Sequence, residues 1–599
     1  MNSRQINILS DLLNSKATHW AFIILMPLVF CYPILLSGNN LGISDWDFHF
    51  ALFEAAYKVL IEYGQLPLWN PWQCSGTQLF QHAESSILTP FFLLGFLFKI
   101  TFALKLSIYL HLVMAYHGIY LIGAKLHDLK SPLSILIASL FFVLSSSFSL
   151  HLAEGHTWVL PATYFPYIYY FFKRSVDNYQ PKDFVLTSIF LSLVVFEGGA
   201  YPAPFIVFFC IVSAITESFV KKRITPVSAL IIIGILALLI SSIKFIPLWD
   251  FLSQFPRFVR KFETNTGVSL VNFYTSSNLN WHERSNYFGP FLILIGAITC
   301  VSRLRSIDKI KGSIHLLVPL IIVGSLIPGS FAEYSPYNLL IQLPIFKSLH
   351  QAGRFNILFT FILALTFFYL AKELEQYFSQ NKNNVLLTFV ISMAIFTSAD
   401  LIITGQKPFF KAFPYEYNEI VERYNNDKNS NLHFLPTITQ LDGYGKKSYS
   451  SDYIAVSVLN KRLKYCYIGG IPRNTADPSR PLVYSDSLDV EISNIHFTPN
   501  KVTFDANLNK PAQITLNQAY VRGWKFSLPE ISTREEERLT VVNLDAGEYK
   551  EIYFHYFPNS IIVGLLFTIC GIIIAAWLIM TDSSSRYSFQ SLVKKLQQD

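Results

Sequence analysis

The chain alternates between long apolar runs and polar segments that carry most of its charged residues. A run of roughly 17 to 25 apolar residues is long enough to cross a bilayer as a helix. The sequence therefore predicts a polytopic α-helical membrane protein with about twelve transmembrane helices. These runs begin near residues 18, 103, 132, 157, 183, 203, 226, 287, 312, 355, 384 and 559.

The apolar run from Leu88 to Ile100 is shorter than these and contains Pro90. We interpret it as a re-entrant or interfacial helix. Counting it as a span would invert every later loop and place the basic cluster at residues 221–223 outside, against the positive-inside rule.

Two long polar segments lie between the predicted spans. Residues 38–86 form a long first outer loop with a candidate helix from about Phe48 to Tyr63. We expect residues 405–558 to form an extracytoplasmic domain, either α/β or a β-sandwich. In its second half, apolar and polar residues alternate as they do in β-strands. The expected organisation is a transmembrane domain over 1–404, this outer domain, a final transmembrane helix over 559–580 and a cytoplasmic tail over 581–599.

The composition supports a membrane protein. Of 599 residues, 52% are hydrophobic and 15% are charged, and the mean hydropathy is +0.36. An ordinary soluble domain is about 25% charged, so these values exclude a disordered chain and disfavour a soluble enzyme. The net charge of +7 fits Lys and Arg retained on the cytoplasmic side, and without a basic patch interleaved with aromatic residues we expect no nucleic-acid partner.

The cysteines and the N-terminal run refine this assignment. Only Cys74 and Cys466 fall in polar segments, where they could pair in an oxidising compartment, and no CxxC spacing is present. The first apolar run has no small-residue cleavage site, so we interpret it as a retained span.

Ionisable residues from separate loops all fall on the predicted outer face. Such groups are costly at a membrane boundary unless they are paired or solvated, so their convergence predicts a polar cavity. They are Asp45, Asp47, His49, His82, Glu84, His151, Glu154, His156, Glu197, His282, Glu283, His350 and Arg354.

Several of these residues also have structural interpretations. Asp45 and Asp47 could cap the following helix. The histidines of the 151–156 turn could hold a metal or only make the turn polar. Arg354 could snorkel to the interface or bind phosphate. Glu197 lies within an apolar run, where an ionisable residue is a functional hypothesis by default.

One chemistry suits this set of groups. A carboxylate at the outer membrane face can take the proton of an acceptor hydroxyl while cations or a metal hold a leaving phosphate. Hydrolysis or transport could use similar residues.

The chain resembles the YfhO-like bacterial membrane proteins of the GT-C glycosyltransferase superfamily, in order along nearly its whole length. In the first loop, Ser44-Asp45 stands where the family has Gly-Asp. The other matching segments are Gly64 to Pro71, Gly76 to Leu79, Glu283 with Tyr287 and Gly289, Gly353-Arg354-Phe355, Gly523-Trp524, Ala546 to Glu548 and Tyr556 to Pro558.

The resemblance implies a GT-C fold and a site that faces the periplasm or exterior. The implied donor is a sugar on a polyprenyl phosphate, and the implied acceptor is an envelope glycopolymer, glycolipid or protein. Asp45 becomes the general base, with Asp47 assisting or sharing a divalent cation (Mg²⁺ or Mn²⁺). Ser44 in place of Gly could alter the turn before Asp45.

The remaining roles follow from the same resemblance. Arg354, with His282, would hold the leaving lipid phosphate. Trp69 and Trp72 would stack on a sugar or anchor the loop at the interface. Other polar residues would line the cavity and bind the sugar, namely His82, Glu84, His156, Glu197 and Glu283.

Two other functions remain open from the sequence. One is a transporter or flippase of a lipid-linked substrate. The long acidic outer loop and the absence of two repeated halves in the sequence argue against this function. The other is a non-catalytic envelope scaffold that binds lipid-linked sugar. The expected location is the bacterial cytoplasmic membrane, and the resemblance implies a donor synthase and a flippase as partners.

Overall fold

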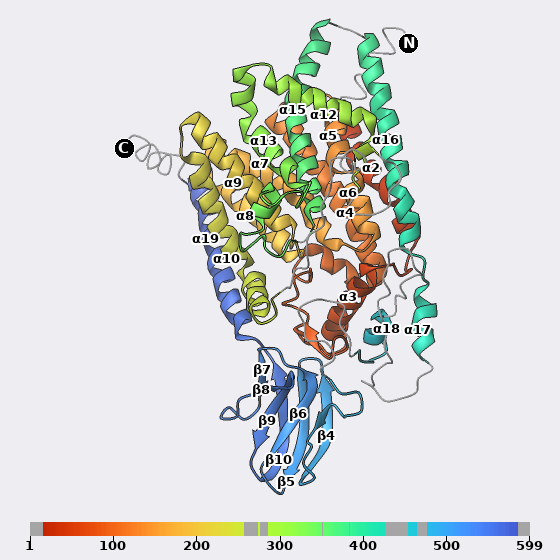
Figure 1. Cartoon of the computed structure of the whole chain (residues 1–599), viewed down its shortest axis with the longest axis vertical. Helices are drawn as coiled ribbons and strands as arrows, with labels where there is room; N and C mark the ends of the chain where they lie inside the picture. The colour runs from red at the N-terminus through yellow and green to blue at the C-terminus, as the bar shows by residue number, and fades with distance from the viewer. Residues whose placement is uncertain are drawn as a thin grey trace.

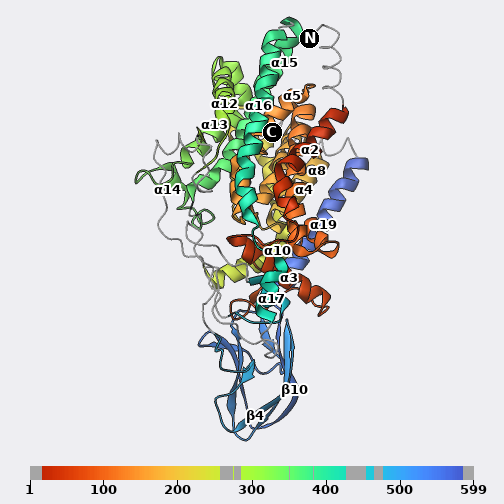
Figure 2. The ribbon, with the colours of Figure 1, turned by 90° about the vertical axis from the view of Figure 1, so that its right-hand side faces the viewer.

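The computed structural model describes residues 16–256, 274–275, 285–349, 351–381, 384–425, 453–463 and 476–584. A bundle of helices forms one end of the molecule and a β-sandwich forms the other, and the short helices α3 (Asp45–Ile61), α17 (Tyr417–Asn425) and α18 (Tyr453–Val458) lie where the two meet (Figures 1 and 2).

Each of the twelve predicted apolar runs contains a helix. The bundle helices are α2 (Lys16–Leu36), α4 (Ile100–Leu121), α5 (Pro132–Phe142), α6 (Ser146–Ala153), α7 (Phe165–Asn178), α8 (Pro181–Phe196), α9 (Pro202–Lys221), α10 (Thr225–Gln254), α12 (Gly289–Leu304), α13 (Ile307–Leu326), α15 (Asn356–Asn381), α16 (Asn384–Ala412) and α19 (Asn559–Ser584). Shorter turns are η2 (Ile122–Leu126), η3 (Thr157–Tyr164), α14 (Pro336–Leu340) and η4 (Ala352–Phe355).

Fewer than twelve of these helices are long enough to span a bilayer. Among the described residues, eight helical segments pass on length and hydropathy, and α5 with α6, bent by 42°, would make a ninth. The predicted run near 157 divides into η3 and the 14-residue α7, and the runs near 183 and 287 hold α8 and α12, of 16 residues each. The structure thus supports a multi-pass membrane protein, and the count of twelve is not confirmed.

Proline marks where several of these helices begin. Proline lacks a backbone N–H and has a fixed φ, so it fits the first turn, where that donor would be unpaired. Helices α5, α7, α8, α9, α10 and α12 all carry proline at the first or second position.

The first loop folds as short elements against the end of the bundle. Helix α3 begins at Asp45, three residues before the predicted start, and Ser44 is its N-cap residue. The loop continues through the two-residue strands β1 (Trp69–Asn70) and β2 (Thr77–Gln78) to η1 (Pro90–Phe96). Element η1 is a short 3₁₀ helix in the run that we interpreted as re-entrant or interfacial.

The sheet domain predicted before the last helix is confirmed. Two four-stranded antiparallel sheets, ordered β4-β5-β10-β7 and β3-β6-β9-β8, face each other. Strand β5 alternates inward residues such as Val502 and Phe504 with outward ones, as its sequence predicts. The strands are β3 (Val483–Tyr484), β4 (Val490–Thr498), β5 (Lys501–Leu508), β6 (Ala512–Ala519), β7 (Trp524–Phe526), β8 (Arg534–Glu536), β9 (Leu539–Leu544) and β10 (Gly547–Tyr556).

Helix α19 attaches the sandwich to the bundle. It begins three residues after β10 ends and runs along α10 (Figure 1). A Cβ at Gly564 would lie 2.5 Å from the carbonyl oxygen of Ser242, and one at Gly571 would lie 2.8 Å from Leu239 Cβ. Glycine at these two positions therefore lets the two helices pack closely. At the other boundary, α16 continues to Ala412, past the predicted domain start at residue 405.

Candidate active site

Asp45 contacts His156, which lies in the turn between α6 and η3 and in turn contacts His151 of α6. Oδ2 of Asp45 lies 3.2 Å from Nε2 of His156, and the Nδ1 atoms of His156 and His151 lie 3.0 Å apart. The Asp45 side chain is 22% exposed and that of His156 is 12% exposed. The carboxylate is thus oriented by a histidine and can still be reached from outside.

Gly155 fixes the position of this carboxylate. Its φ is +82°, and a Cβ there would lie 2.2 Å from the backbone nitrogen of Trp46. The backbone N–H of Asp45 also donates to the carbonyl of Glu154 (3.1 Å). Only glycine allows this turn to pack directly on the first residues of α3.

Ser44, the residue before Asp45, has a glycine-like backbone. Its φ is +54° and its ψ is −130°, a region that few residues other than glycine occupy. Its hydroxyl donates to the Glu154 carboxylate at 2.5 Å. Backbone strain of this kind often occurs at functional sites.

Asp47 is buried, in contrast to the partly exposed Asp45. It is 1% exposed, and its Oδ1 accepts the backbone N–H of Tyr453 (3.0 Å), the first residue of α18. Residues two apart on a helix point in nearly opposite directions. Asp45 and Asp47 therefore do not converge on a shared cation, and among the described residues no group of three His, Cys, Asp or Glu is placed to hold a metal ion.

Arg354 lies in an aromatic cage that adjoins the histidine pair. Its guanidinium carbon is 4.7 Å from the ring centre of Trp158 and 4.2 Å from that of Tyr201. The Trp158 ring also contacts those of His151 (4.8 Å) and His156 (6.1 Å). Residues from the turn after α6, from the turn between α8 and α9 and from η4 thus meet around one indole ring.

The Trp158 indole is itself an available donor. Its ring is 3% exposed, and its Nε1–H has no acceptor among the described residues. A buried donor without an acceptor is costly, and a bound oxygen atom would remove that cost.

The second half of the first loop brings His82 and Glu84 to the same end of the bundle. A Cβ on Gly198, whose φ is +79°, would lie 2.8 Å from the Glu84 Cα, so this glycine turn also packs on backbone. Oε2 of Glu84 is 3.6 Å from Nε2 of buried His49. Nδ1 of His82 accepts the backbone N–H of Glu84 (3.2 Å).

Both buried histidines of this loop are held neutral. Desolvation lowers the pKa of His82 to about 3, with Lys244 and His49 adding to the effect. Desolvation also lowers the pKa of His49, more than Glu84 and Asp45 raise it. We therefore expect both to act as neutral hydrogen-bonding groups.

Two buried lysines on bundle helices hold the first loop by its backbone. Nζ of Lys244, on α10, donates to the carbonyls of Phe80 (2.8 Å), His82 (2.7 Å) and Ser85 (3.0 Å). Nζ of Lys105, on α4, donates to the carbonyls of Gly38 (3.0 Å) and Asn40 (2.7 Å). Each lysine fixes one end of the loop.

Glu197 has a different set of neighbours. Its Oε1 lies 3.7 Å from Nε2 of His111, and its side chain is 6% exposed. The His111 ring lies 4.0 Å from that of Phe91 in η1. The structure thus places Glu197 in a buried group beside the loop, one residue before the turn that holds Glu84.

The other predicted residues divide into two classes. His282, Glu283 and His350 lie outside the described residues. Trp69 and Trp72 are both fully buried, so neither anchors the loop at an interface nor stacks on a ligand. Trp69 packs on Trp524 and Tyr556 of the sandwich (5.1 and 4.6 Å), which places Trp524 in the core as well.

Cys74 is disulfide-bonded, and Cys466 lies outside the described residues. The four other cysteines are free: Cys31, Cys210, Cys300 and Cys570.

Sequence reasoning missed Trp158 and Tyr201, which share the apolar character of the runs around them. It also missed Lys105 and Lys244, although a lysine within an apolar span is a signal that could have found them.

No family model and no curated protein sequence matches the chain. Among solved structures, the cryo-EM structure of the arabinofuranosyltransferase AftD from Mycobacteria is similar over 70% of this chain, with a TM-score of 0.46 and 14% identity. The chain spans 29% of the length of AftD.

Proposed function

We propose that this protein is a membrane glycosyltransferase that transfers a sugar from a polyprenyl phosphate to a cell-envelope acceptor. The reaction would take place on the outer face of the bacterial cytoplasmic membrane. Support comes from the eight apolar helices of spanning length, the family resemblance in the sequence and the arrangement of groups around Asp45.

One observation carries this proposal. A reachable carboxylate, Asp45, contacts His156, and Trp158 packs both on that histidine and on the Arg354 guanidinium. A base and a fixed cation are the two groups that transfer from a phosphate leaving group requires.

The chemistry can be written in terms of these side chains. The acceptor hydroxyl oxygen bonds to C1 of the sugar while the bond between C1 and the phosphate oxygen breaks. The electron pair of that bond leaves with the polyprenyl phosphate, whose charge Arg354 would balance. The hydroxyl proton passes to Asp45, which His156 keeps oriented.

The remaining residues would position the substrates. The Trp158 indole N–H would donate to an oxygen of the sugar or phosphate. Glu84, which is 30% exposed, and His82 would bind sugar hydroxyls from the other half of the loop. The sandwich, joined to that loop through Trp69, would orient the acceptor or shield the site.

The test compares envelope glycans in cells that carry wild type, a deletion or Asp45→Asn at matched membrane abundance. We expect one sugar to be lost in both altered strains while its lipid-linked donor accumulates. Loss in the deletion alone would remove Asp45 as the base. An unchanged glycan in both strains would contradict transfer and favour a transporter or scaffold.

A further inference from the structure

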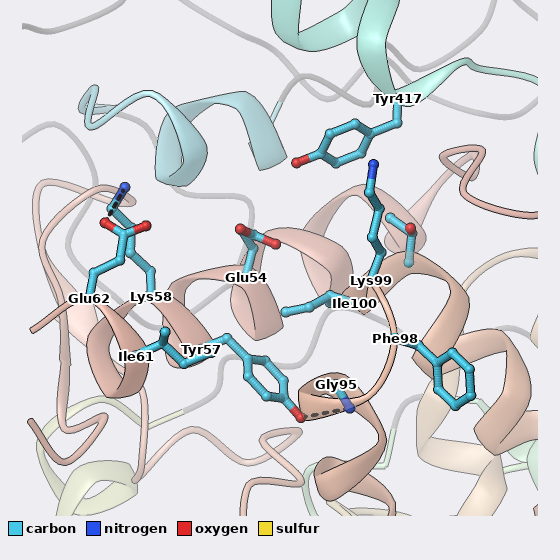
Figure 3. A pocket seen from close by; sticks show the side chains of 11 residues that line it. Glu54, Tyr57, Lys58, Ile61, Glu62, Gly95, Phe98, Lys99, Ile100 and Tyr417 are labelled. Atoms are coloured by element: carbon cyan, nitrogen blue, oxygen red, sulfur yellow. Dashed lines mark hydrogen bonds and ion pairs between the residues drawn. The ribbon is translucent and has the colours of Figure 1, made fainter. Parts of the chain in front are cut away.

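A pocket of about 250 Å³ opens on a face of α3 that the proposed active site does not use. It lies between α3, the end of η1, the start of α4 and Tyr417 of α17 (Figure 3). None of the residues assigned above to the active site lines it. It is therefore a separate feature of the same end of the bundle.

Among the described residues, the pocket holds one carboxylate and one ammonium that have no ion-pair partner. Lys58 is engaged, because its Nζ lies 3.2 Å from Oε2 of Glu62 and 3.3 Å from the carbonyl of Val458. The Glu54 carboxylate makes no hydrogen bond or ion pair with the described part of the chain. The Lys99 ammonium lies over the Tyr417 ring, 5.3 Å from its centre.

These two charges face the same space. Figure 3 shows Glu54 between the Lys58–Glu62 pair and Lys99, with Tyr417 above. The Tyr57 hydroxyl is turned away from both, toward Gly95, whose backbone N–H it accepts (3.1 Å). Burial raises the pKa of Glu54, so a cationic ligand group would favour its ionised form.

Exposed apolar side chains lie at and beside the pocket. Leu97 and Phe98 precede Lys99, and they are 76% and 42% exposed. Ile61, which also lines the pocket, is 62% exposed, and Leu93 and Phe96 of η1 are 61% and 53% exposed. Because a span-length helix begins at Ile100, this apolar surface lies where the bilayer boundary is expected.

We propose that this pocket binds the zwitterionic headgroup of a phospholipid with a primary ammonium group, of the phosphatidylethanolamine type. The phosphate would contact Lys99, and the ammonium would donate to Glu54. The acyl chains would lie over the exposed side chains of η1 and the residues that follow it.

The headgroup chemistry makes this assignment specific. A primary ammonium has three N–H donors for Glu54, whereas the trimethylammonium of phosphatidylcholine has none. Phosphatidylglycerol offers the phosphate without any cation. Soluble O-phosphoethanolamine has the same charges but no acyl chains to contact the exposed apolar side chains.

The experiment is a lipid titration of the delipidated full-length protein, followed by native mass spectrometry. We expect phosphatidylethanolamine to bind about tenfold more tightly than phosphatidylcholine or phosphatidylglycerol, the size of one charge-assisted hydrogen bond. Glu54→Gln should remove this preference and leave phosphatidylglycerol binding unchanged. Lys99→Gln should weaken all three lipids, and O-phosphoethanolamine should compete poorly.

Glu419→Gln is the matched control, because it neutralises an exposed carboxylate on α17 outside the pocket and should leave the preference intact. Equal binding of the three lipids, or a preference that survives Glu54→Gln, would overturn the proposal. If O-phosphoethanolamine displaces the lipid at concentrations similar to that of the lipid, the occupant of the pocket is not a lipid. The readout is binding, so it does not depend on the proposed transferase activity.

Discussion

Nε2 of His156 lies 3.2 Å from Oδ2 of Asp45, although the two residues are separated by more than a hundred positions in the chain. The contact joins the first turn of α3 to the turn after α6. It orients a carboxylate whose side chain is 22% exposed, and a general base needs both a fixed orientation and access to the acceptor hydroxyl.

The glycine that supports this contact should not tolerate a side chain. Gly155→Ala places a methyl group 2.2 Å from a backbone nitrogen at a φ of +82°, so we expect a loss of roughly 1–3 kcal/mol of stability together with reduced activity. Gly234→Ala, where a Cβ meets nothing within 4 Å, is the control. Equal thermal midpoints for the two purified variants would contradict the role of Gly155.

The aromatic cage should distinguish arginine from lysine at position 354. Arg354→Lys keeps the charge but loses the planar stacking on Trp158 and Tyr201, so we expect KM for the donor to rise about tenfold. Arg303→Lys changes another buried arginine that lies over a tyrosine ring, 5.5 Å from the centre of Tyr369, outside the proposed site. A donor KM that rises equally in both variants would argue against a phosphate-binding role for Arg354.

Lys244 should act as a positioning residue for the loop. Lys244→Met leaves three buried carbonyls without their donor, and we expect it to cost roughly 3 kcal/mol or more of stability. Limited proteolysis should then cut the 80–85 segment faster than in wild type. The control Lys411→Met, at an exposed position of α16, should be cleaved at the wild-type rate. A wild-type cleavage pattern for Lys244→Met would contradict this role.

The neutral state of His82 should make stability depend on pH. Its pKa is about 3 in the folded protein and about 6.5 in an unfolded chain. Between these values the unfolded state binds more protons, so stability is complete above about pH 6.5 and falls as the pH is lowered. The difference between the thermal midpoints at pH 7.5 and pH 4.5 should be smaller in His82→Gln than in wild type. An equal difference in the two proteins would contradict a neutral His82 in the folded state.

The sequence predicts the helices and the sandwich because their periodic patterns are local. The apolar runs mark the helices, and the alternation from Val502 to Leu508 marks a strand that buries one face. Helix length is less predictable, since the chain bends at the residues between α5 and α6 and turns into 3₁₀ helix at 157–164. Apolar composition alone does not specify such breaks.

The site was predictable only in part. Asp45, His156 and Arg354 were identified as polar residues of outer loops, and the structure brings the first two into contact and the third onto Trp158. The role of Asp47 was not predictable, because its partner is the backbone of Tyr453, 406 residues away. Trp69 looked like an interfacial residue, and only the sandwich that buries it reveals its role.

The same substitution at two positions of α3 tests whether Asp45 is the base of the reaction. Asp45→Asn should lower the transfer rate by about 10²- to 10⁴-fold and leave the thermal midpoint near that of wild type. Asp47→Asn keeps an oxygen that can accept the Tyr453 N–H, so transfer should stay close to wild type. A normal transfer rate in Asp45→Asn, or an equal loss in both variants, would contradict the account.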